Sequence, residues 1–214
     1  MLLASRNFAY HLVANGACLI AETFATVEAE GWEGVPEGAC LFASNHQSML
    51  DPPLIGGLIP REIAFVARKS LFDNPVFGGV IRACRAIPLD RGEADISAIR
   101  RTLAVLAEGR ALLIFPEGTR SMDGQLQSTK SGAGLLAIKS GVPVVPVRIR
   151  GIRDVLPRGS RWLRGGARIR IQFGTAIPAS SLDPGKDHDD RFGEASRRIM
   201  AAIAALPDIS DPGL

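Results

Sequence analysis

Short apolar runs separated by helix-length stretches make up most of the chain between residues 39 and 173. Each run is about four to eight residues long and is bounded by polar or turn-forming residues, which favours buried strands. The runs are Ala39–Ala43, Ile63–Ala67, Ala86–Leu89, Ala111–Phe115, Val142–Ile149 and, as a candidate late strand, Ala167–Phe173. Two expected helices, Asp95–Glu108 and Gly132–Ser140, are each followed by a glycine that can end a helix. This alternation predicts an α/β fold with a mostly parallel central sheet covered by helices.

The N-terminal part holds the most apolar long stretch of the chain, residues 8–27. Four polar or helix-weakening residues interrupt it: His11, Asn15, Gly16 and Glu22. A helix that spans a bilayer needs about 20 largely apolar residues, so this stretch is poorly suited to spanning one. The sequence favours a helix that lies at a membrane interface or packs on its own domain, and both alternatives stay open.

The chain therefore divides into three parts. Residues 1–30 are expected to form an N-terminal helical segment that is a candidate for membrane contact. Residues 31–206 are expected to form the α/β domain, which closes with an amphipathic helix over Arg191–Leu206, and residues 207–214 read as a loose tail. A length of 214 residues with 46% hydrophobic and 22% charged residues fits one domain with such an appendage.

Cysteine usage points away from disulfides and metal. Cys18, Cys40 and Cys84 are odd in number and show no metal-ligand spacing, so they imply neither a disulfide framework nor a zinc site. We expect no metal and no cofactor. The first residues show no basic start and no cleavage pattern, so we also expect no cleavable signal and a reducing, cytosolic setting.

Positive charge is concentrated in one segment, although the net charge is only +3. This segment, residues 148–170, contains one acidic residue, Asp154, and eight arginines: Arg148, Arg150, Arg153, Arg158, Arg161, Arg164, Arg168 and Arg170. Trp162 lies among them, and a tryptophan beside arginines suits the headgroup layer of an anionic membrane. No zinc-finger spacing or RNA-binding aromatic motif accompanies the arginines, so we expect no nucleic-acid partner.

A histidine and an aspartate, His46 and Asp51, lie five positions apart directly after the first apolar run. Histidine can move protons near neutral pH, and a carboxylate can orient it and stabilise its charged form. Pro52 and Pro53 follow, and proline favours the first turn of a helix, so Asp51 reads as an N-cap with His46 in the preceding loop. In that geometry the two side chains can meet; the alternative is that Asp51 only caps and His46 is an ordinary loop residue.

Polar motifs also follow two other predicted strands: Asp90-Arg91, and Glu117-Gly118-Thr119-Arg120. Because the carboxyl ends of parallel strands meet at one edge of a sheet, we expect these motifs to converge with His46 on one crevice. Arginine and lysine side chains there, which are Arg91, Arg120 and Lys130, are able to bind an anion such as phosphate.

The residues between these cations have their own expected uses. Gly118 allows close approach of the backbone, and Thr119 adds a hydroxyl. Glu117 needs a donor nearby, so it either holds an arginine or bonds a substrate hydroxyl. The alternative is an ordinary turn with surface charges.

Four blocks of the chain resemble the glycerolipid acyltransferases typified by bacterial 1-acyl-glycerol-3-phosphate acyltransferase. They follow the order of that family: Asn45 to Asp51, Arg85 to Arg91, Phe115 to Ser121, and Val142 to Val147. Together they span roughly half of the chain, and the third block is the most specific. The second block departs from the family, because Arg85 and Pro88 stand where a glycine and an aromatic residue are usual.

The resemblance implies an O-acyltransferase in which His46 is the catalytic base and Asp51 its orienting partner. It implies that Arg91, Glu117, Gly118 and Arg120 bind the phosphate and glycerol part of the acceptor. Lys130 and the pair Arg68-Lys69 match further basic positions of the family and add positive potential.

The implied reaction moves a fatty acyl group from acyl-CoA or acyl carrier protein to the free hydroxyl of a lysophospholipid. Lysophosphatidate, which gives phosphatidate, is the expected acceptor, and a lysolipid with another headgroup, such as an amino-acid lipid, is the alternative. We expect backbone N–H groups at the helix start near Asp51 to bind the oxyanion. The expected location is peripheral, on the cytoplasmic face of an anionic membrane.

Two readings from other classes stay open. In a serine hydrolase, Ser48 or another serine is acylated with His46 as its base, although no Gly-x-Ser-x-Gly motif is present. In a non-catalytic lipid-binding module, the arginine-rich segment makes the contact.

Overall fold

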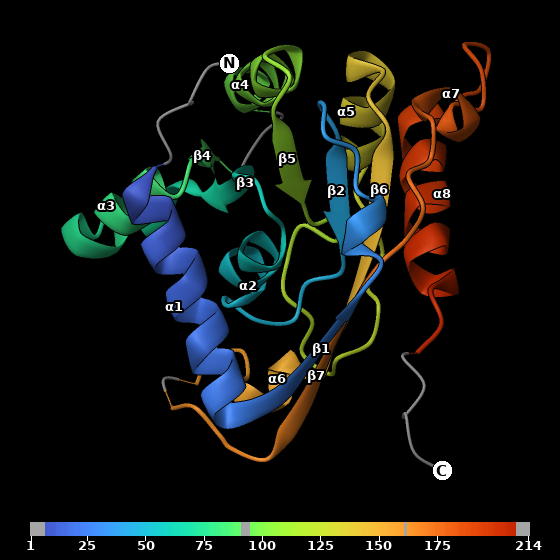
Figure 1. The fold of residues 1–214 in the computed structure, drawn as a ribbon. Coiled ribbons are helices and arrows are strands. Elements are labelled where there is room, and N and C mark those ends of the chain that lie inside the picture. The colour runs from blue at the N-terminus through green and yellow to red at the C-terminus, as the bar shows by residue number, and fades with distance from the viewer. Residues whose placement is uncertain (1–6, 91–94, 161, 209–214) are drawn as a thin grey trace.

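Seven strands form one twisted sheet in the computed structural model, which describes residues 7–90, 95–160 and 162–208 (Figure 1). The order across the sheet is β1-β7-β6-β2-β5-β3-β4. The strands are β1 Ala25–Glu30, β2 Leu41–Ser44, β3 Ile63–Arg68, β4 Ala86–Leu89, β5 Ala111–Ile114, β6 Val144–Arg150 and β7 Ala167–Phe173. Every neighbouring pair is parallel except β6 and β7, so the predicted α/β fold with a mostly parallel sheet is confirmed.

Helices cover both faces of the sheet (Figure 1). They are α1 Phe8–Phe24, α2 Asp51–Leu58, α3 Pro75–Ala83, α4 Ile96–Ala107, α5 Gly132–Ser140, α6 Ile152–Val155, α7 Ala179–Leu182 and α8 Arg191–Ala205, with short 3-10 turns η1 Trp32–Gly34 and η2 Lys69–Phe72. Residues of α1, α2 and α6 pack on one face, and residues of α4, α5 and α8 pack on the other. Strand β2 is buried on both faces, with Phe42 in the first layer and Leu41 in the second, which is why its sequence is apolar throughout.

The expectation of a helical segment over residues 1–30 is wrong at its C-terminal end. Helix α1 stops at Phe24, and residues 25–30 form β1, which pairs with β7 in parallel register. The β-branched Thr26 and Val27 favour an extended backbone, and Glu28 forms an ion pair with Arg170 on β7 at 3.2 Å. This edge strand is only partly buried, so it lacks the continuous apolar pattern that marks the central strands.

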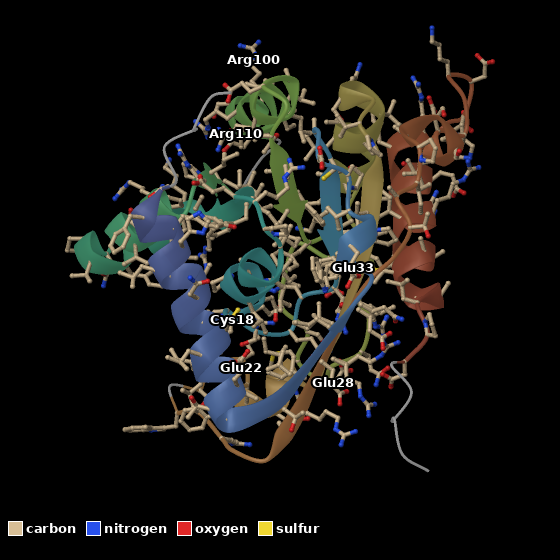
Figure 2. All side chains as sticks on the ribbon, viewed as in Figure 1. Cys18, Glu22, Glu28, Glu33, Arg100 and Arg110 are labelled. Carbon is tan, nitrogen blue, oxygen red and sulfur yellow. The ribbon has the colours of Figure 1, made fainter. Side chains whose placement is uncertain are left out.

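Helix α1 packs against α2 through one stripe of small residues and a tyrosine. Tyr10, Ala14, Ala17 and Ala21 are buried at helical spacing, and Cys18 lies beside α2 (Figure 2). Gly57 of α2 permits this approach, because a Cβ there would lie 2.4 Å from the Cys18 sulfur. Within the described residues, no helix has both the length and the apolar character that crossing a bilayer requires.

Candidate active site

The chain leaves β2 at Asn45, whose buried amide replaces a backbone partner of β6. Its Nδ2 donates to the carbonyl of Ile149 at 2.9 Å, and its Oδ1 accepts from the N–H of Ile149 at 2.8 Å. Because both groups of one residue are bonded, the loop after β2 leaves the sheet in a fixed direction. The next residue is His46, so this pair of bonds helps to determine where the imidazole lies.

His46 and Asp51 are in direct contact. The distance from His46 Nδ1 to Asp51 Oδ2 is 2.7 Å, and the Asp51 side chain is fully buried while the His46 side chain is 16% exposed. The same Oδ2 accepts from the backbone N–H groups of Gln47 at 2.7 Å and Ser48 at 2.9 Å. The prediction that a turn before α2 brings the two side chains together is confirmed.

The predicted role of Asp51 as N-cap is wrong, because it is the first residue of α2 and Leu50 is the cap residue. The N–H of Leu54, which a cap at position 51 would use, donates instead to the Leu50 carbonyl at 3.0 Å. The Asp51 carboxylate is therefore directed backwards to the loop. The N–H groups of Gln47 and Ser48 are occupied by it, so they are not free to bind an oxyanion.

The loop after β5 supports His46 from the other side. The Phe115 ring stacks on the imidazole, with centroids 3.9 Å apart and planes inclined by 17°. The N–H of Ser121 donates to the His46 carbonyl at 2.8 Å, so residues 115–121 wrap around the residue. Within this loop Gly118 has φ 65°, a left-handed conformation that glycine adopts without strain.

Two cavities meet at His46. The larger, of about 300 Å³, extends between β3, α1 and α3 over a mostly apolar wall and also reaches Thr119, Arg120 and Arg158. The smaller, of about 210 Å³, lies between β3, β5, α4 and α5 and includes Gly118 and Lys130. His46, Phe115 and Arg68 belong to the wall of both. A proton-accepting group thus lies where two mostly apolar spaces join beside cationic side chains.

Glu117 lies under this site rather than on the wall of either cavity, and it is 2% exposed. Neither of its oxygens has a hydrogen bond of normal geometry to a described residue. Burial raises the pKa of Glu117 from 4.5 to about 7, although the nearby backbone N–H groups of His46 and Gln127 and the charge of Arg148 oppose that rise. Of the two expected uses of Glu117, proximity to an arginine is the one that this placement favours.

The remaining predicted cations are arranged differently. Lys69 forms an exposed ion pair with Asp90 at 3.2 Å and does not line either cavity. Arg91 lies outside the described residues. Arg158 was not predicted as a site residue, although the arginine-rich segment gave a signal for it, and it lines the larger cavity with Arg120.

Arg85, which stands where the resembled family has glycine, has φ 63°. An arginine therefore has a left-handed backbone here, a conformation that glycine adopts without strain. Its guanidinium pairs with Glu62 at 3.2 Å, a contact that helps to hold this conformation.

Ser48 is not placed as a nucleophile. Its side chain is fully buried, and its hydroxyl donates to the Leu156 carbonyl at 3.0 Å. The serine hydrolase alternative therefore has no support from this residue. In the described part of the chain, no group of three or more histidine, cysteine or acidic side chains is arranged to hold a metal ion.

Known proteins resemble this chain in sequence and in structure. The profile of the family described as Acyltransferase matches residues 26–150. A chloroplastic 1-acyl-sn-glycerol-3-phosphate acyltransferase of Brassica napus is 30% identical over 182 residues, which are 83% of this chain and 53% of that protein. A 1-acyl-sn-glycerol-3-phosphate acyltransferase of Streptococcus pneumoniae is 30% identical over 170 residues, 78% of this chain and 60% of that protein. This chain thus spans about half the length of the plant relative.

A solved structure extends the likeness to the fold. The crystal structure of the 1-acyl-sn-glycerophosphate acyltransferase from Thermotoga maritima matches with a TM-score of 0.72 and 27% identity. The match covers 95% of this chain and 82% of that one.

Proposed function

Because this chain belongs to the acyltransferase family, we propose that it moves a fatty acyl group from a thioester to the free hydroxyl of a lysophospholipid. The proposed acceptor is 1-acyl-glycerol-3-phosphate, because the relatives from Brassica napus and Streptococcus pneumoniae are named for that activity. The proposed donor is acyl-CoA or acyl carrier protein, and the reaction uses no metal or cofactor. The observation that carries the proposal is the His46–Asp51 contact at the junction of two cavities.

In the proposed mechanism, His46 removes the proton of the acceptor hydroxyl as that oxygen attacks the thioester carbonyl. Asp51 Oδ2 has only acceptor capacity, so it holds the proton on Nδ1 and leaves Nε2 as the base. The buried carboxylate then stabilises the imidazolium that forms. The collapse of the tetrahedral intermediate releases the thiolate, which takes the proton. General-base assistance of this kind is typically worth about 10²–10⁴-fold in rate.

The substrates are proposed to lie on opposite parts of the same crevice. Arg120 and Lys130, with Arg91, supply cations for the acceptor phosphate, while Gly118 and Thr119 allow it to approach the backbone. The apolar wall between α1 and α3 suits a fatty acyl chain. Glu117 is buried beside the loop, and Arg68, which lines both cavities, adds positive potential there.

Purified protein tests the proposal directly. Lysophosphatidate and lysolipids with other headgroups, including amino-acid lipids, are each incubated with acyl-CoA or acyl carrier protein, and the diacyl product and free fatty acid are measured. We expect diacyl product from lysophosphatidate and its loss in His46→Ala. Near-normal turnover by His46→Ala would overturn the mechanism, and preference for another lysolipid would replace the acceptor. Fatty acid release without acceptor at the rate of transfer would favour a hydrolase.

We further propose that the protein works as a peripheral protein on the cytoplasmic face of an anionic membrane. The side chains of Phe8, Leu12, Leu19 and Val76 are exposed by 78%, 62%, 66% and 77%. They come from α1 and α3, which both contribute to the wall of the larger cavity. Such a group of exposed apolar side chains suits an interface with lipid. In the arginine-rich segment, Trp162 is 79% exposed, which suits the headgroup layer.

Liposome flotation separates the two contacts. We expect joint replacement of Arg158, Arg161, Trp162 and Arg164 to weaken binding to anionic liposomes, because headgroup attraction is lost. A Phe8→Ser, Leu12→Ser, Leu19→Ser variant should weaken binding to anionic and zwitterionic liposomes alike. Unchanged binding in both variants would place the contact elsewhere. Liposome binding by a protein without transferase activity would favour the non-catalytic module.

A further inference from the structure

We propose that Arg158 binds the phosphate monoester of the acceptor together with Arg120. This inference rests on the proposed function and adds a residue to it. Arg158 follows α6, so it lies beyond residues 26–150, the part that the family profile matches. It nevertheless lines the same cavity as His46, Thr119 and Arg120.

The segment that carries Arg158 is fixed to the loops of the site. The Ser48 hydroxyl donates to the Leu156 carbonyl at 3.0 Å, which joins this segment to the turn between His46 and Asp51. The N–H of Arg164 donates to the Val155 carbonyl at 2.9 Å, which closes the loop between these two residues. The Arg158 guanidinium donates through Nη1 to the Arg120 carbonyl at 2.7 Å. Two arginines from distant parts of the sequence are therefore held side by side on one wall.

The charge of Arg158 is not compensated by the described part of the chain. No carboxylate of a described residue forms an ion pair with it, whereas Lys69 is paired with Asp90 at 3.2 Å and Arg170 with Glu28 at 3.2 Å. A guanidinium has five N–H donors in a planar fork, and the Arg120 carbonyl takes one of them. The others remain for an anion in the cavity, and the fork matches two oxygens of a phosphate.

A purely structural role for Arg158 would be to hold the loop around Arg120. Arg153 offers a matched comparison, because its Nε donates to the Met122 carbonyl at 3.0 Å, two residues further along the same loop. Arg153 does not line either cavity that reaches His46. The two arginines thus share the anchoring contact and differ in access to the substrate.

Steady-state kinetics of Arg158→Gln, Arg158→Lys and Arg153→Gln test the assignment. Glutamine removes the charge, and lysine keeps the charge but lacks the planar fork. The acceptors are lysophosphatidate and uncharged monoacylglycerol in nonionic micelles, which remove any effect of an anionic surface. Glycerol 3-phosphate is added as a competing phosphate, and circular dichroism verifies folding.

We expect Arg158→Gln to lower kcat/KM for lysophosphatidate by about 10- to 100-fold, as expected for one charged hydrogen-bonding group. It should weaken inhibition by glycerol 3-phosphate about tenfold and leave the rate with monoacylglycerol unchanged. The kcat/KM of Arg158→Lys for lysophosphatidate should lie between those of Arg158→Gln and the wild type, and that of Arg153→Gln should match the wild type. Equal behaviour of Arg158→Gln and Arg153→Gln, with an active wild type, would overturn this assignment alone. A wild type that does not acylate lysophosphatidate would overturn the proposed function and the assignment with it.

Discussion

One oxygen of Asp51 holds both the His46 ring and the loop that carries it. Oδ2 lies 2.7 Å from His46 Nδ1 and also accepts from two backbone N–H groups, those of Gln47 and Ser48. Three donors on one oxygen fix the imidazole relative to its own backbone. The contact is fully buried on the Asp51 side, so the negative charge acts on the ring through a low local dielectric.

Replacing Asp51 with asparagine should leave the fold in place and remove the charge that stabilises the imidazolium. We expect Asp51→Asn to lower kcat by about 10²–10⁴-fold with both substrates saturating. Steady-state acyl transfer to lysophosphatidate measures this, with circular dichroism as the test of folding. Asp154→Asn is the matched control, because Asp154 is exposed and lines neither cavity at His46, and the rate of this variant should not change. An Asp51→Asn enzyme within tenfold of the wild type would contradict the role.

Asn45 should matter for stability more than an exposed asparagine does. Asn45→Ala leaves the N–H and carbonyl of Ile149 buried without partners, so we expect a loss of about 2–4 kcal/mol in the free energy of unfolding. Asn74→Ala is the comparison, since Asn74 caps α3 at an exposed position and its loss should cost about 1 kcal/mol. Urea titration gives both values. Equal losses in the free energy of unfolding would show that the buried Asn45–Ile149 bonds contribute no more than an exposed helix cap.

The sequence predicts the sheet well where strands are buried on both faces. Strands β2 and β5 have no exposed residue, so their apolar runs are unbroken and their type and place are readable. Strand β1 lies at the edge of the described sheet, where it pairs with β7 and is partly exposed. Its sequence therefore merges with the apolar stretch of α1. The antiparallel orientation of β7 relative to β6 also depends on pairing between distant parts of the sequence. The local pattern of apolar residues does not determine that orientation.

The sequence likewise predicts one part of the functional site and not the rest. His46 and Arg120 converge because the carboxyl ends of parallel strands share an edge, and that follows from the order of motifs. The burial of Glu117 depends on which way one loop side chain turns, and spacing does not determine that. Arg158 reaches the site only because its segment is bonded to Ser48 and Arg120, a relationship that only the folded chain reveals.

Glu117 should make stability fall as pH rises. Burial raises the pKa of Glu117 from 4.5 to about 7, so between these values the folded state binds a proton that the unfolded state has released. Stability therefore decreases with pH across that window, and the full cost is reached above about pH 7. In Glu117→Gln this contribution is absent. We expect the stability of the variant relative to wild type to increase by roughly 2–3 kcal/mol between pH 5 and pH 8.

Urea unfolding of both proteins at several pH values measures that difference. Glu108→Gln is a suitable control, because Glu108 is exposed and its replacement should shift stability equally at all these pH values. A difference between Glu117→Gln and wild type that does not vary with pH would mean that Glu117 is ionised in the folded protein at pH 5, with Arg148 as its counter-ion.

Two adjacent glycines of α3 should respond to alanine in opposite directions. A Cβ on Gly78 would lie 2.6 Å from the Phe72 carbonyl oxygen of η2, whereas one on Gly79 would meet nothing within 4 Å. We expect Gly78→Ala to cost about 1–3 kcal/mol by forcing α3 away from η2, and Gly79→Ala to stabilise by about 0.5–1 kcal/mol through helix propensity. Thermal unfolding should show a lower Tm for the first and a higher Tm for the second.

The same pair tests whether α3 shapes the larger cavity. Phe77 and Val80 of α3 line that cavity, so a shift of the helix in Gly78→Ala should raise KM for long-chain thioesters more than for short-chain ones. Gly79→Ala leaves the helix in position and should keep the wild-type chain-length profile. If both variants keep that profile while Gly78→Ala is destabilised, the acyl chain does not contact α3, and the smaller cavity beside α4 and α5 becomes its expected place.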